Sequence, residues 1–559
     1  MRIRSHLRWR HCLLFAGAVG VALWFWSYSC CGDDKGDPYL VVVATTDLHG
    51  ALNPADARES ESERRGAPWL AGYIQAIRDR VGDEKVLLLD SGDFMQGTLL
   101  SNTTEGEVVV ALFNKLRYQA VALGNHEFDY GPVGPDAVPT KPGDDPLGAL
   151  KSRAAQARFP LLSANVFDKK TRQAFEFPGL RRTLLIEKGG KKIGIIGISS
   201  ELTASVTHPL NVENLYFESI RDTLLREVPE MRRQGAELVI VLAHSGAIQK
   251  KNSKVEGEIV DAIRGLPRGY VDLVLAGHTH QRIAEVVNDI PLLEADAHGR
   301  YLGIAMFYEP SPLKKGNPKI ATVSVTNREE KPPYPIPSVR EVKADPSVTD
   351  LLAPFIEKVR PISDEIIGTT QGRIWRDRDG ESPLGNLVAD SMLEAIEGAE
   401  IAMTNSGGIR NDVQPGVITF GDLYEVLPFD NKLILLNMTG DQVRGALAYG
   451  TSGGHGHIQI SGLRVYYVQD GRGKRIITVK KENGEVVKKN QLYKVVTSDF
   501  LYHGGDGYSE FKDAVLLQES SIPLRTALVE GVKRHSPVQV KPIGRFVNGG
   551  GRSKLGEGK

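Results

Sequence analysis

The chain has 559 residues, which is too long for one ordinary core, so two or three domains are expected. Its 69 basic residues balance 69 acidic residues, and the lack of a basic excess argues against a nucleic acid polymer as partner. All three cysteines, Cys12, Cys30 and Cys31, precede residue 32, which excludes a disulfide framework or a thiol nucleophile from the remainder.

The first 37 residues are typical of an export segment. Four arginines precede an apolar stretch over 12–26, and small residues and cysteines follow. Residues 29–34, Ser-Cys-Cys-Gly-Asp-Asp, resemble the end of a bacterial lipoprotein signal, which implies a lipid on Cys30 or Cys31. A short uncleaved anchor is the alternative, because the bulky residues before Cys30 fit that signal loosely. Both interpretations predict export, to the periplasm or as a lipoprotein at the cell envelope.

The rest of the chain is predicted to form two α/β domains. In residues 38–344, β-type runs alternate with amphipathic segments, among them 107–116 and 220–233, as in a layered α/β domain. Four prolines within 331–337 end this domain, and apolar spacing predicts a linker helix within 345–367. A second α/β domain is expected over 368–548, followed by a disordered tail over 549–559.

Seven side chains of metal-ligand type follow apolar β-like runs in the first domain. The runs are residues 41–43, 86–89, 121–123, 239–242 and 273–275. The candidate ligands are Asp47, His49, Asp93, Asn125, His244, His278 and His280. Any one of them alone is more often a turn residue or a satisfied core histidine. Because ligands gather at the carboxyl ends of strands, all seven in register predict one site at one edge of a sheet.

This ligand set indicates a two-metal site. Carboxylate, imidazole and amide together suit Zn, Mn or Co, and seven ligands are too many for one tetrahedral ion. Asp93 is the natural bridge, with Gly92 allowing close backbone approach. Two ions roughly 3.5–4 Å apart can clamp a phosphoryl group and lower the pKa of water. Hydrolysis of a phosphate ester is therefore the leading reaction.

His126 directly follows a candidate ligand, so it cannot easily bind the same ion. Its imidazole is placed to meet the phosphate or the leaving group, and Asp129 would fix its tautomer. The two residues are predicted to be a catalytic pair. The alternative is that Asp129 only caps the turn before Tyr130.

Glycine-rich loops in the second domain carry arginine and aromatic side chains. Residues 405–410 offer Arg410 beside backbone that can approach a ligand closely. Phe429 and Phe500 could flank a nucleobase, and each stacking contact would be worth about 1–3 kcal/mol. A single phenylalanine beside a strand is more often a core residue. His455 and His457 are expected to be solvated rather than ligands.

Several motifs resemble known families. Residues 47–50, 92–93, 124–129, His244 and 277–280 resemble the calcineurin-like metallophosphoesterases, and Phe128-Asp129 is similar to the 5′-nucleotidase variant. The resemblance implies a four-layer α/β-β-α sandwich with two metal sites sharing Asp93. One site would comprise Asp47, His49, Asp93 and His280, and the other Asp93, Asn125, His244 and His278. His280 is a departure, since some periplasmic members carry glutamine there.

Residues 385–387, 407–410, 427–429 and 504–508 resemble the 5′-nucleotidase C-terminal domain. The resemblance implies that Phe429 and Phe500 sandwich the base and that Asp506 binds the ribose. The phosphate, ribose or base contacts would come from Arg410, Asn405 and Asn431, with Arg378 as a further phosphate ligand. Some bacterial members have arginine in place of Asn386.

These inferences predict an exported two-metal phosphohydrolase that cleaves nucleoside 5′-monophosphates to nucleoside and phosphate, with UDP-sugars or other nucleotides as further substrates. One alternative is a 2′,3′-cyclic-nucleotide 2′-phosphodiesterase and 3′-nucleotidase, whose members tend to have asparagine in place of Asp129. Another is a surface lipoprotein that binds nucleotides without turnover. The complete ligand set argues against the second alternative.

Overall fold

The computed structural model describes residues 37–52, 66–250, 254–309, 317–325, 330–453, 456–470, 473–540 and 543–549. The predicted export segment before residue 37 and the predicted tail after residue 549 lie outside the described residues. Within the described ranges, no helix has both the length and the apolar character needed to cross a membrane.

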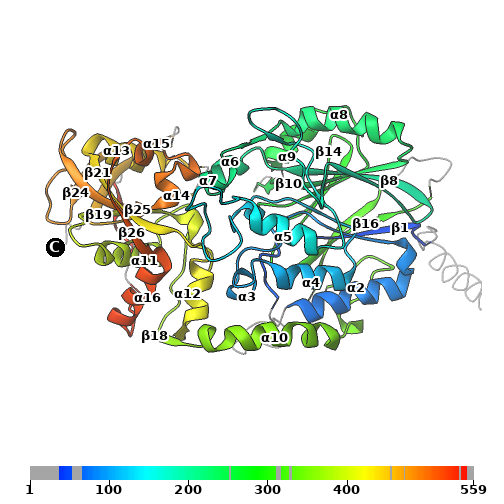
Figure 1. The fold of residues 1–559 in the computed structure, drawn as a ribbon, viewed down its shortest axis with the longest axis horizontal. Coiled ribbons are helices and arrows are strands. Elements are labelled where there is room, and N and C mark those ends of the chain that lie inside the picture. Colours follow the sequence, from blue (N-terminus) through cyan, green and yellow to red (C-terminus); the bar gives the residue numbers. More distant parts are fainter. Residues whose placement is uncertain are drawn as a thin grey trace, which may run out of the picture.

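Two sheets form the first domain (Figure 1). The seven-stranded sheet has the order β17-β16-β1-β2-β3-β4-β6, and the six-stranded sheet has the order β14-β15-β13-β10-β8-β7. The first sheet comprises β1 (Leu40–Thr45), β2 (Val86–Asp90), β3 (Ala120–Ala122), β4 (Leu161–Leu162), β6 (Leu180–Arg181), β16 (Tyr301–Phe307) and β17 (Lys319–Ser324). The second comprises β7 (Thr183–Lys188), β8 (Lys191–Ser199), β10 (Leu238–His244), β13 (Leu273–Ala276), β14 (Arg282–Val287) and β15 (Ile290–Ala295).

The candidate ligands therefore follow strands of both sheets. β1, β2 and β3 belong to the first sheet, whereas β10 and β13 belong to the second. The expectation that one sheet edge carries all seven ligands is wrong. The apolar runs of the two sheets look alike in the sequence, because both sheets are buried on both faces.

Alternating side chains of β1 show how the sheets pack. Leu40 and Val42 join the core between the two sheets, together with Leu242 of β10. Val41 and Val43 point the other way, into a core with the helices α2 (Ala67–Val81) and α4 (Glu107–Leu116). On the far side, α8 (Ile220–Arg233) and α9 (Glu258–Arg264) cover the second sheet. The predicted four-layer sandwich is confirmed.

The helix α10 (Pro346–Ser363) connects the two domains. Its N-cap is Asp345, whose side chain accepts a hydrogen bond from the Ser347 backbone N–H. It lies against α2 of the first domain and against α12 (Phe420–Val426) of the second (Figure 1).

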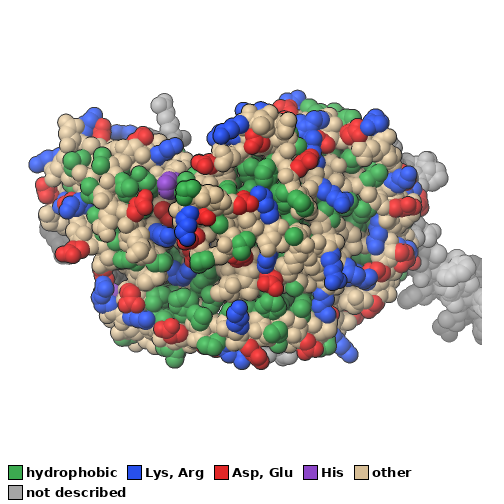
Figure 2. All heavy atoms as spheres, viewed as in Figure 1, with side chains coloured by type: hydrophobic (Ala, Val, Ile, Leu, Met, Phe, Trp, Pro, Cys, Tyr) green, Lys and Arg blue, Asp and Glu red, His purple; other side chains and the backbone are tan. Residues whose placement is uncertain are grey.

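Basic and acidic side chains are mixed over the face of the molecule that is drawn in Figure 2, as the net charge of zero leads one to expect.

The second domain is built on a five-stranded sheet with the order β22-β19-β25-β21-β26. Its strands are β19 (Ile401–Asn405), β21 (Lys432–Thr439), β22 (Ile458–Ser461), β25 (Leu492–Ser498) and β26 (Val515–Pro523). The helices α11 (Pro383–Ala395) and α16 (Leu524–His535) pack on one face, and α13 (Gly440–Tyr449) packs on the other. Loops at the ends of β19 and β21 reach the junction with the first domain.

The environment of His457 differs from expectation. The residue is buried, its ring lies 4.5 Å from that of Phe546, and its Nδ1 lies 2.7 Å from the Ile458 carbonyl oxygen. The expectation that His457 is solvated is wrong, because β22 carries the chain inward at this point. His455 lies outside the described residues.

The close approach of the two sheets at Gly197 of β8 gives a stability prediction. A Cβ at Gly197 would lie 2.4 Å from the Leu162 carbonyl carbon, whereas one at Gly303 of β16 would meet nothing closer than 3.5 Å. We expect Gly197→Ala to lower the free energy of unfolding by about 1–3 kcal/mol, because the backbone must shift. The matched variant Gly303→Ala should change it by much less. Equal urea or thermal unfolding midpoints for the two variants would contradict this packing.

Candidate active site

Five of the seven candidate ligands adopt left-handed backbone conformations, which residues other than glycine rarely take. Their φ angles are 51° for Asp47, 50° for His49, 54° for Asp93, 82° for His278 and 54° for His280. The His49 N–H donates to the Asp93 carbonyl at 2.9 Å, so two of the ligand loops support each other. Such conformations cluster at functional sites, where surrounding structure holds them in place.

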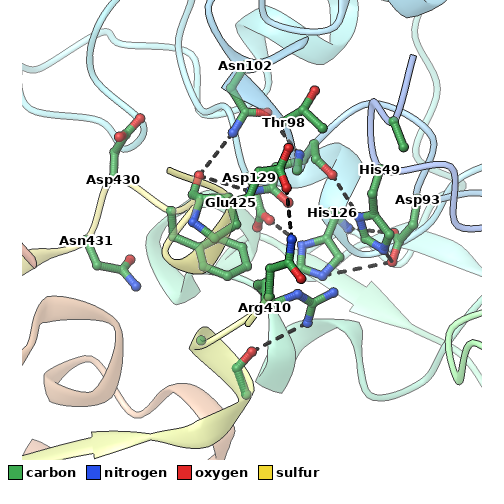
Figure 3. Close-up of a pocket in the computed structure, with 18 of the residues that line it drawn as sticks. His49, Asp93, Thr98, Asn102, His126, Asp129, Arg410, Glu425, Asp430 and Asn431 are labelled. Carbon is green, nitrogen blue, oxygen red and sulfur yellow. Dashed lines mark hydrogen bonds and ion pairs between the residues drawn. The ribbon is translucent and has the colours of Figure 1, made fainter. Parts of the chain in front are cut away.

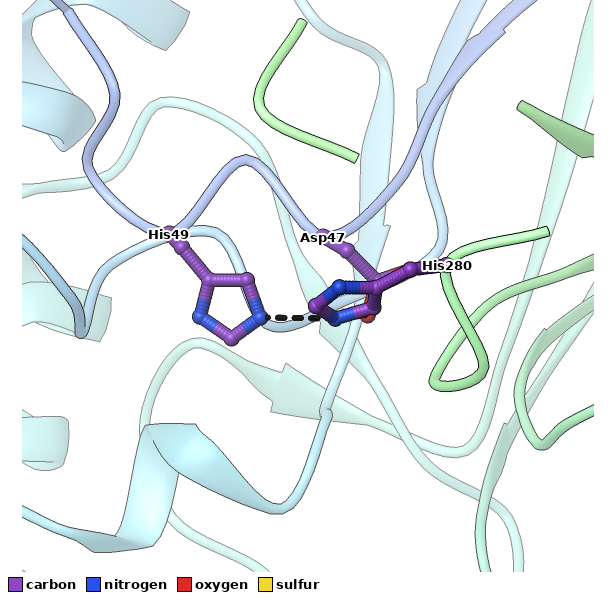
Figure 4. Close-up of side chains that lie close together, drawn as sticks. All are labelled: Asp47, His49 and His280. Carbon is purple, nitrogen blue, oxygen red and sulfur yellow. Dashed lines mark hydrogen bonds and ion pairs between the residues drawn. The ribbon is translucent and has the colours of Figure 1, made fainter. Parts of the chain in front are cut away.

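Asp47, His49 and His280 form the first group that could hold a metal ion (Figure 4). The Nε2 atoms of the two histidines lie 3.2 Å apart, and His280 Nε2 lies 3.4 Å from Asp47 Oδ1. His49 Nδ1 lies 2.7 Å from the Gln96 carbonyl oxygen, which fixes the ring and turns Nε2 toward the group. Two imidazole nitrogens and a carboxylate oxygen thus converge on one point.

Asp93, His244 and His278 form the second such group. His244 Nε2 lies 3.0 Å from Asp93 Oδ2, and His49 Nε2 of the first group lies 4.0 Å from the same oxygen. The Asp93 carboxylate therefore stands between the groups, as a bridging ligand must. His244 Nδ1 lies 2.9 Å from the Ser91 carbonyl oxygen, which orients this ring as well.

Two observations fit divalent ions at these groups. Asn125 Oδ1 is buried beside them and has no hydrogen-bond partner among the described residues. Burial alone would raise the pKa of Asp93, but the charges of His244 and His126 hold it well below its usual range, so the carboxylate is ionised. An unpaired buried acceptor and an ionised carboxylate among imidazoles form the donor set that Zn, Mn or Co accepts.

His126 and Asp129 lie next to the metal groups and face the cleft (Figure 3). His126 Nδ1 is 2.5 Å from Asp129 Oδ2, and His126 Nε2 is 3.9 Å from Asp93 Oδ2. The His126 backbone N–H also donates to Asp93 Oδ1 at 2.9 Å. The imidazole is thus anchored on one side by Asp129 and directs its other nitrogen toward the metal groups.

All seven candidate substrate residues of the second domain line the same cleft as the metal groups. The cleft has a volume of about 2150 Å³. The residues are Arg378, Asn405, Arg410, Phe429, Asn431, Phe500 and Asp506. Asn405 Nδ2 donates to Asp506 Oδ2 at 2.6 Å. Burial and the nearby Arg378 and Arg376 lower the pKa of Arg410 to about 10, so it stays charged at neutral pH.

The loop that carries Phe429 extends onto the first domain. The Pro428 carbonyl accepts hydrogen bonds from Gln96 Nε2 at 3.2 Å and from Asn102 Nδ2 at 3.0 Å. The Phe429 ring stacks on His126 with 5.6 Å between ring centroids. Phe429 and Phe500 make no ring contact with each other among the described residues, so a slot for a third ring can lie between them.

Two further residues that were not predicted from the sequence belong to this site. The Glu127 carboxylate accepts from the backbone N–H groups of Asp93, Phe94 and Gly124 at 2.8, 3.0 and 2.7 Å, and so fixes the ligand loops. The His298 ring lies 5.8 Å from that of His49, and its backbone N–H donates to the Asp47 carbonyl. His298 follows β15, which is the same signal that marked the other ligands.

Two His and Asp groups with the Asp93 carboxylate between them, next to an anchored imidazole, form the site of a metal-dependent hydrolase. Comparison with known proteins specifies the class. Residues 40–282 match the calcineurin-like phosphoesterase family, and residues 362–513 match the 5′-nucleotidase C-terminal domain family.

The chain is 27% identical to protein UshA of Yersinia enterocolitica, over 95% of this chain and 98% of the relative. It is 27% identical to the human 5′-nucleotidase, over 90% of this chain and 88% of the relative. A 5′-nucleotidase precursor of Thermus thermophilus matches with a TM-score of 0.76 at 25% identity, covering 91% of this chain and 99% of that one.

The chain belongs to the family in which a calcineurin-like phosphoesterase domain is joined to a 5′-nucleotidase C-terminal domain, and it is a metallophosphoesterase of the phosphoric monoester hydrolase type. The metal groups lie in the first of these domains, and the candidate substrate residues lie in the second. The two sets meet in one cleft at the domain junction.

The position of Asp93 between the groups predicts how metal content responds to substitution. Asp93→Ala should lose both ions, because each site loses a ligand, whereas His280→Ala should lose only the ion of the first group. Elemental analysis of the purified, dialysed variants would measure this. Asp129→Ala, which leaves all seven ligands in place, should keep two ions. Two ions bound to Asp93→Ala would contradict the bridging role.

Proposed function

We propose that the protein hydrolyses nucleoside 5′-monophosphates to the nucleoside and phosphate. The observation that carries the proposal is that one cleft is lined by members of both metal groups and by Phe429, Phe500 and Asp506. A two-metal site binds a phosphoryl group, and aromatic rings beside a carboxylate suit a nucleoside. The relatives named 5′-nucleotidase support the same class of substrate.

The residues at the phosphate end of the cleft would have separate roles. One ion would be held by Asp47, His49, Asp93 and His280, and the other by Asp93, Asn125, His244 and His278. When bound, two such ions supply positive charge to phosphoryl oxygens and lower the pKa of water. His126, whose Nδ1 is held by Asp129, would in its doubly protonated form donate a hydrogen bond from Nε2 to a phosphoryl oxygen on which charge develops. Arg410 and Arg378 bind the phosphate through their guanidinium groups.

The nucleoside end of the cleft would set the specificity. Phe429 and Phe500 hold the base between their rings, and Asp506 accepts hydrogen bonds from the ribose hydroxyls. Asn405 already donates to Asp506, so it keeps that carboxylate turned into the cleft. Asn431, also in the lining, is available to the base or ribose. UDP-sugars are included in the proposal as further substrates, because they carry the same nucleoside and a phosphate next to it.

We also propose that the protein is exported. The support is the arginine-rich and apolar segment at the start of the sequence, with Cys30 and Cys31 as candidate sites of a lipid anchor. Radiolabelled palmitate incorporated into the wild-type protein but not into a variant lacking both cysteines would support lipidation. A labelled double variant would contradict it.

Phosphate release from a small panel of substrates tests the proposed activity. With Mn, Co or Zn present, AMP should be cleaved directly. UDP-glucose should release phosphate more slowly, because its pyrophosphate bond must first be hydrolysed to UMP and glucose 1-phosphate before UMP gives uridine and phosphate. Cleavage of 3′-AMP and 2′,3′-cyclic AMP in preference to AMP would instead identify the cyclic-nucleotide phosphodiesterase. If no substrate were cleaved by protein shown to contain two ions, a nucleotide-binding protein without turnover would remain.

A further prediction follows from the proposal that the first domain holds the metal ions and the second domain binds the base. Phe429→Ala combined with Phe500→Ala should lower kcat/KM for AMP by at least about tenfold relative to that for p-nitrophenyl phosphate, because two base contacts are lost. Steady-state kinetics with both substrates measures the ratio. Asp129→Ala is the matched comparison, and it should lower both rates together by about 10²–10⁴-fold. An unchanged ratio in the double variant would contradict base stacking.

A further inference from the structure

A segment of the phosphoesterase domain closes the nucleoside end of the cleft. The helices α6 (Thr203–Val206) and α7 (Pro209–Val212) lie beside α14 (Asp499–Tyr502) of the second domain in Figure 1. α6 also contacts the turn Gly505–Gly507, which carries Asp506. Leu202, Val206 and His208 of this segment line the cleft together with Phe500 and Asp506. The first domain therefore contributes to the wall of the nucleoside pocket.

His208 is the polar side chain of this wall. Only 8% of its surface is exposed, and neither ring nitrogen has a hydrogen-bond partner among the described residues. Its ring lies 6.5 Å from that of Phe500 and 5.6 Å from that of His503. Both nitrogens are closed to solvent in this structure, so a ligand in the cleft can reach them only once the ring turns toward it. Buried polar groups are nearly always hydrogen-bonded, and a histidine with two unpaired nitrogens in a cleft wall is a candidate ligand contact after such a turn.

The charge and the hydrogen-bonding groups of the His208 imidazole limit the kind of ligand that it can contact. Burial and the neighbouring His503 lower the pKa of His208 to about 3, so the imidazole is neutral at physiological pH. A neutral imidazole offers one N–H donor and one bare nitrogen acceptor. It has no charge to attract a phosphate, whereas a nucleobase edge carries matching donors and acceptors. The phosphate-binding arginines are placed elsewhere in the cleft, and Asp506 is placed to take the ribose.

We propose that His208 hydrogen-bonds the edge of the nucleobase that stacks on Phe500, and so selects for substrates that carry a base. The inference rests on the proposed function. It makes base recognition depend on both domains, because His208 belongs to the first domain and Phe500 to the second. Removing a partner of a buried substrate group costs more than removing an apolar contact, so one such hydrogen bond can set specificity.

The test compares substrates with and without a base. In His208→Phe, which keeps an aromatic ring but loses both nitrogens, we expect the ratio of kcat/KM for AMP to that for ribose 5-phosphate to fall by about three- to tenfold. The Kd of adenosine, measured by calorimetry, should rise by a similar factor. His208→Gln restores a donor and an acceptor, so it should recover part of the loss.

His503→Phe is the matched control, because it replaces an imidazole of the same cluster outside the cleft lining. It should leave the ratio and the Kd close to those of the wild type. Two results would overturn the inference: a kcat/KM ratio and an adenosine Kd in His208→Phe equal to those of the wild type, or equal losses in His208→Phe and His503→Phe. In either case His208 would contribute only packing to this wall of the cleft. If the wild type neither cleaves AMP nor binds adenosine, the proposed function itself fails, which is a distinguishable result.

Discussion

The site depends on the placement of one buried carboxylate, that of Asp93. Its Oδ2 lies within 3.0 Å of a His244 nitrogen and 4.0 Å of a His49 nitrogen, so it stands between the two metal groups. The backbone there is left-handed, a conformation that residues other than glycine adopt infrequently. Glu127 holds this backbone in place by accepting hydrogen bonds from four backbone N–H groups of the adjoining loops. The chemistry at the metals thus rests on a second carboxylate that touches no substrate.

The rest of the fold places the candidate substrate-binding residues next to Asp93 and the metal groups. Two sheets deliver the ligands of the first domain, and α10 connects it to a domain that carries arginines and aromatic rings on its loops. The contact between Pro428 and Asn102, and the stacking of Phe429 on His126, place the loop proposed to bind the substrate beside the imidazole proposed to act in catalysis. The residues proposed for reaction and those proposed for recognition are therefore separate in the sequence and adjacent in space.

Much of this could be predicted from the sequence because strand ends and helix periodicity are local signals. The predicted helices over 107–116 and 220–233 coincide with α4 and α8. The assignment of strands to two sheets was missed, since a buried apolar run does not reveal its neighbours. Glu127 was missed because its partners are backbone groups, and His208 because no strand precedes it. His298 did carry the strand-end signal, but one histidine after β15 is weak evidence alone.

The most direct test of the account is a crystal structure with manganese or zinc, adenosine and phosphate, using anomalous scattering to locate the ions. The account predicts two anomalous peaks, one on each side of the Asp93 carboxylate. The phosphate should lie between the ions and Arg410, and the base should lie between Phe429 and Phe500. A single peak, or an ion that does not contact Asp93, would contradict the shared carboxylate on which the site depends.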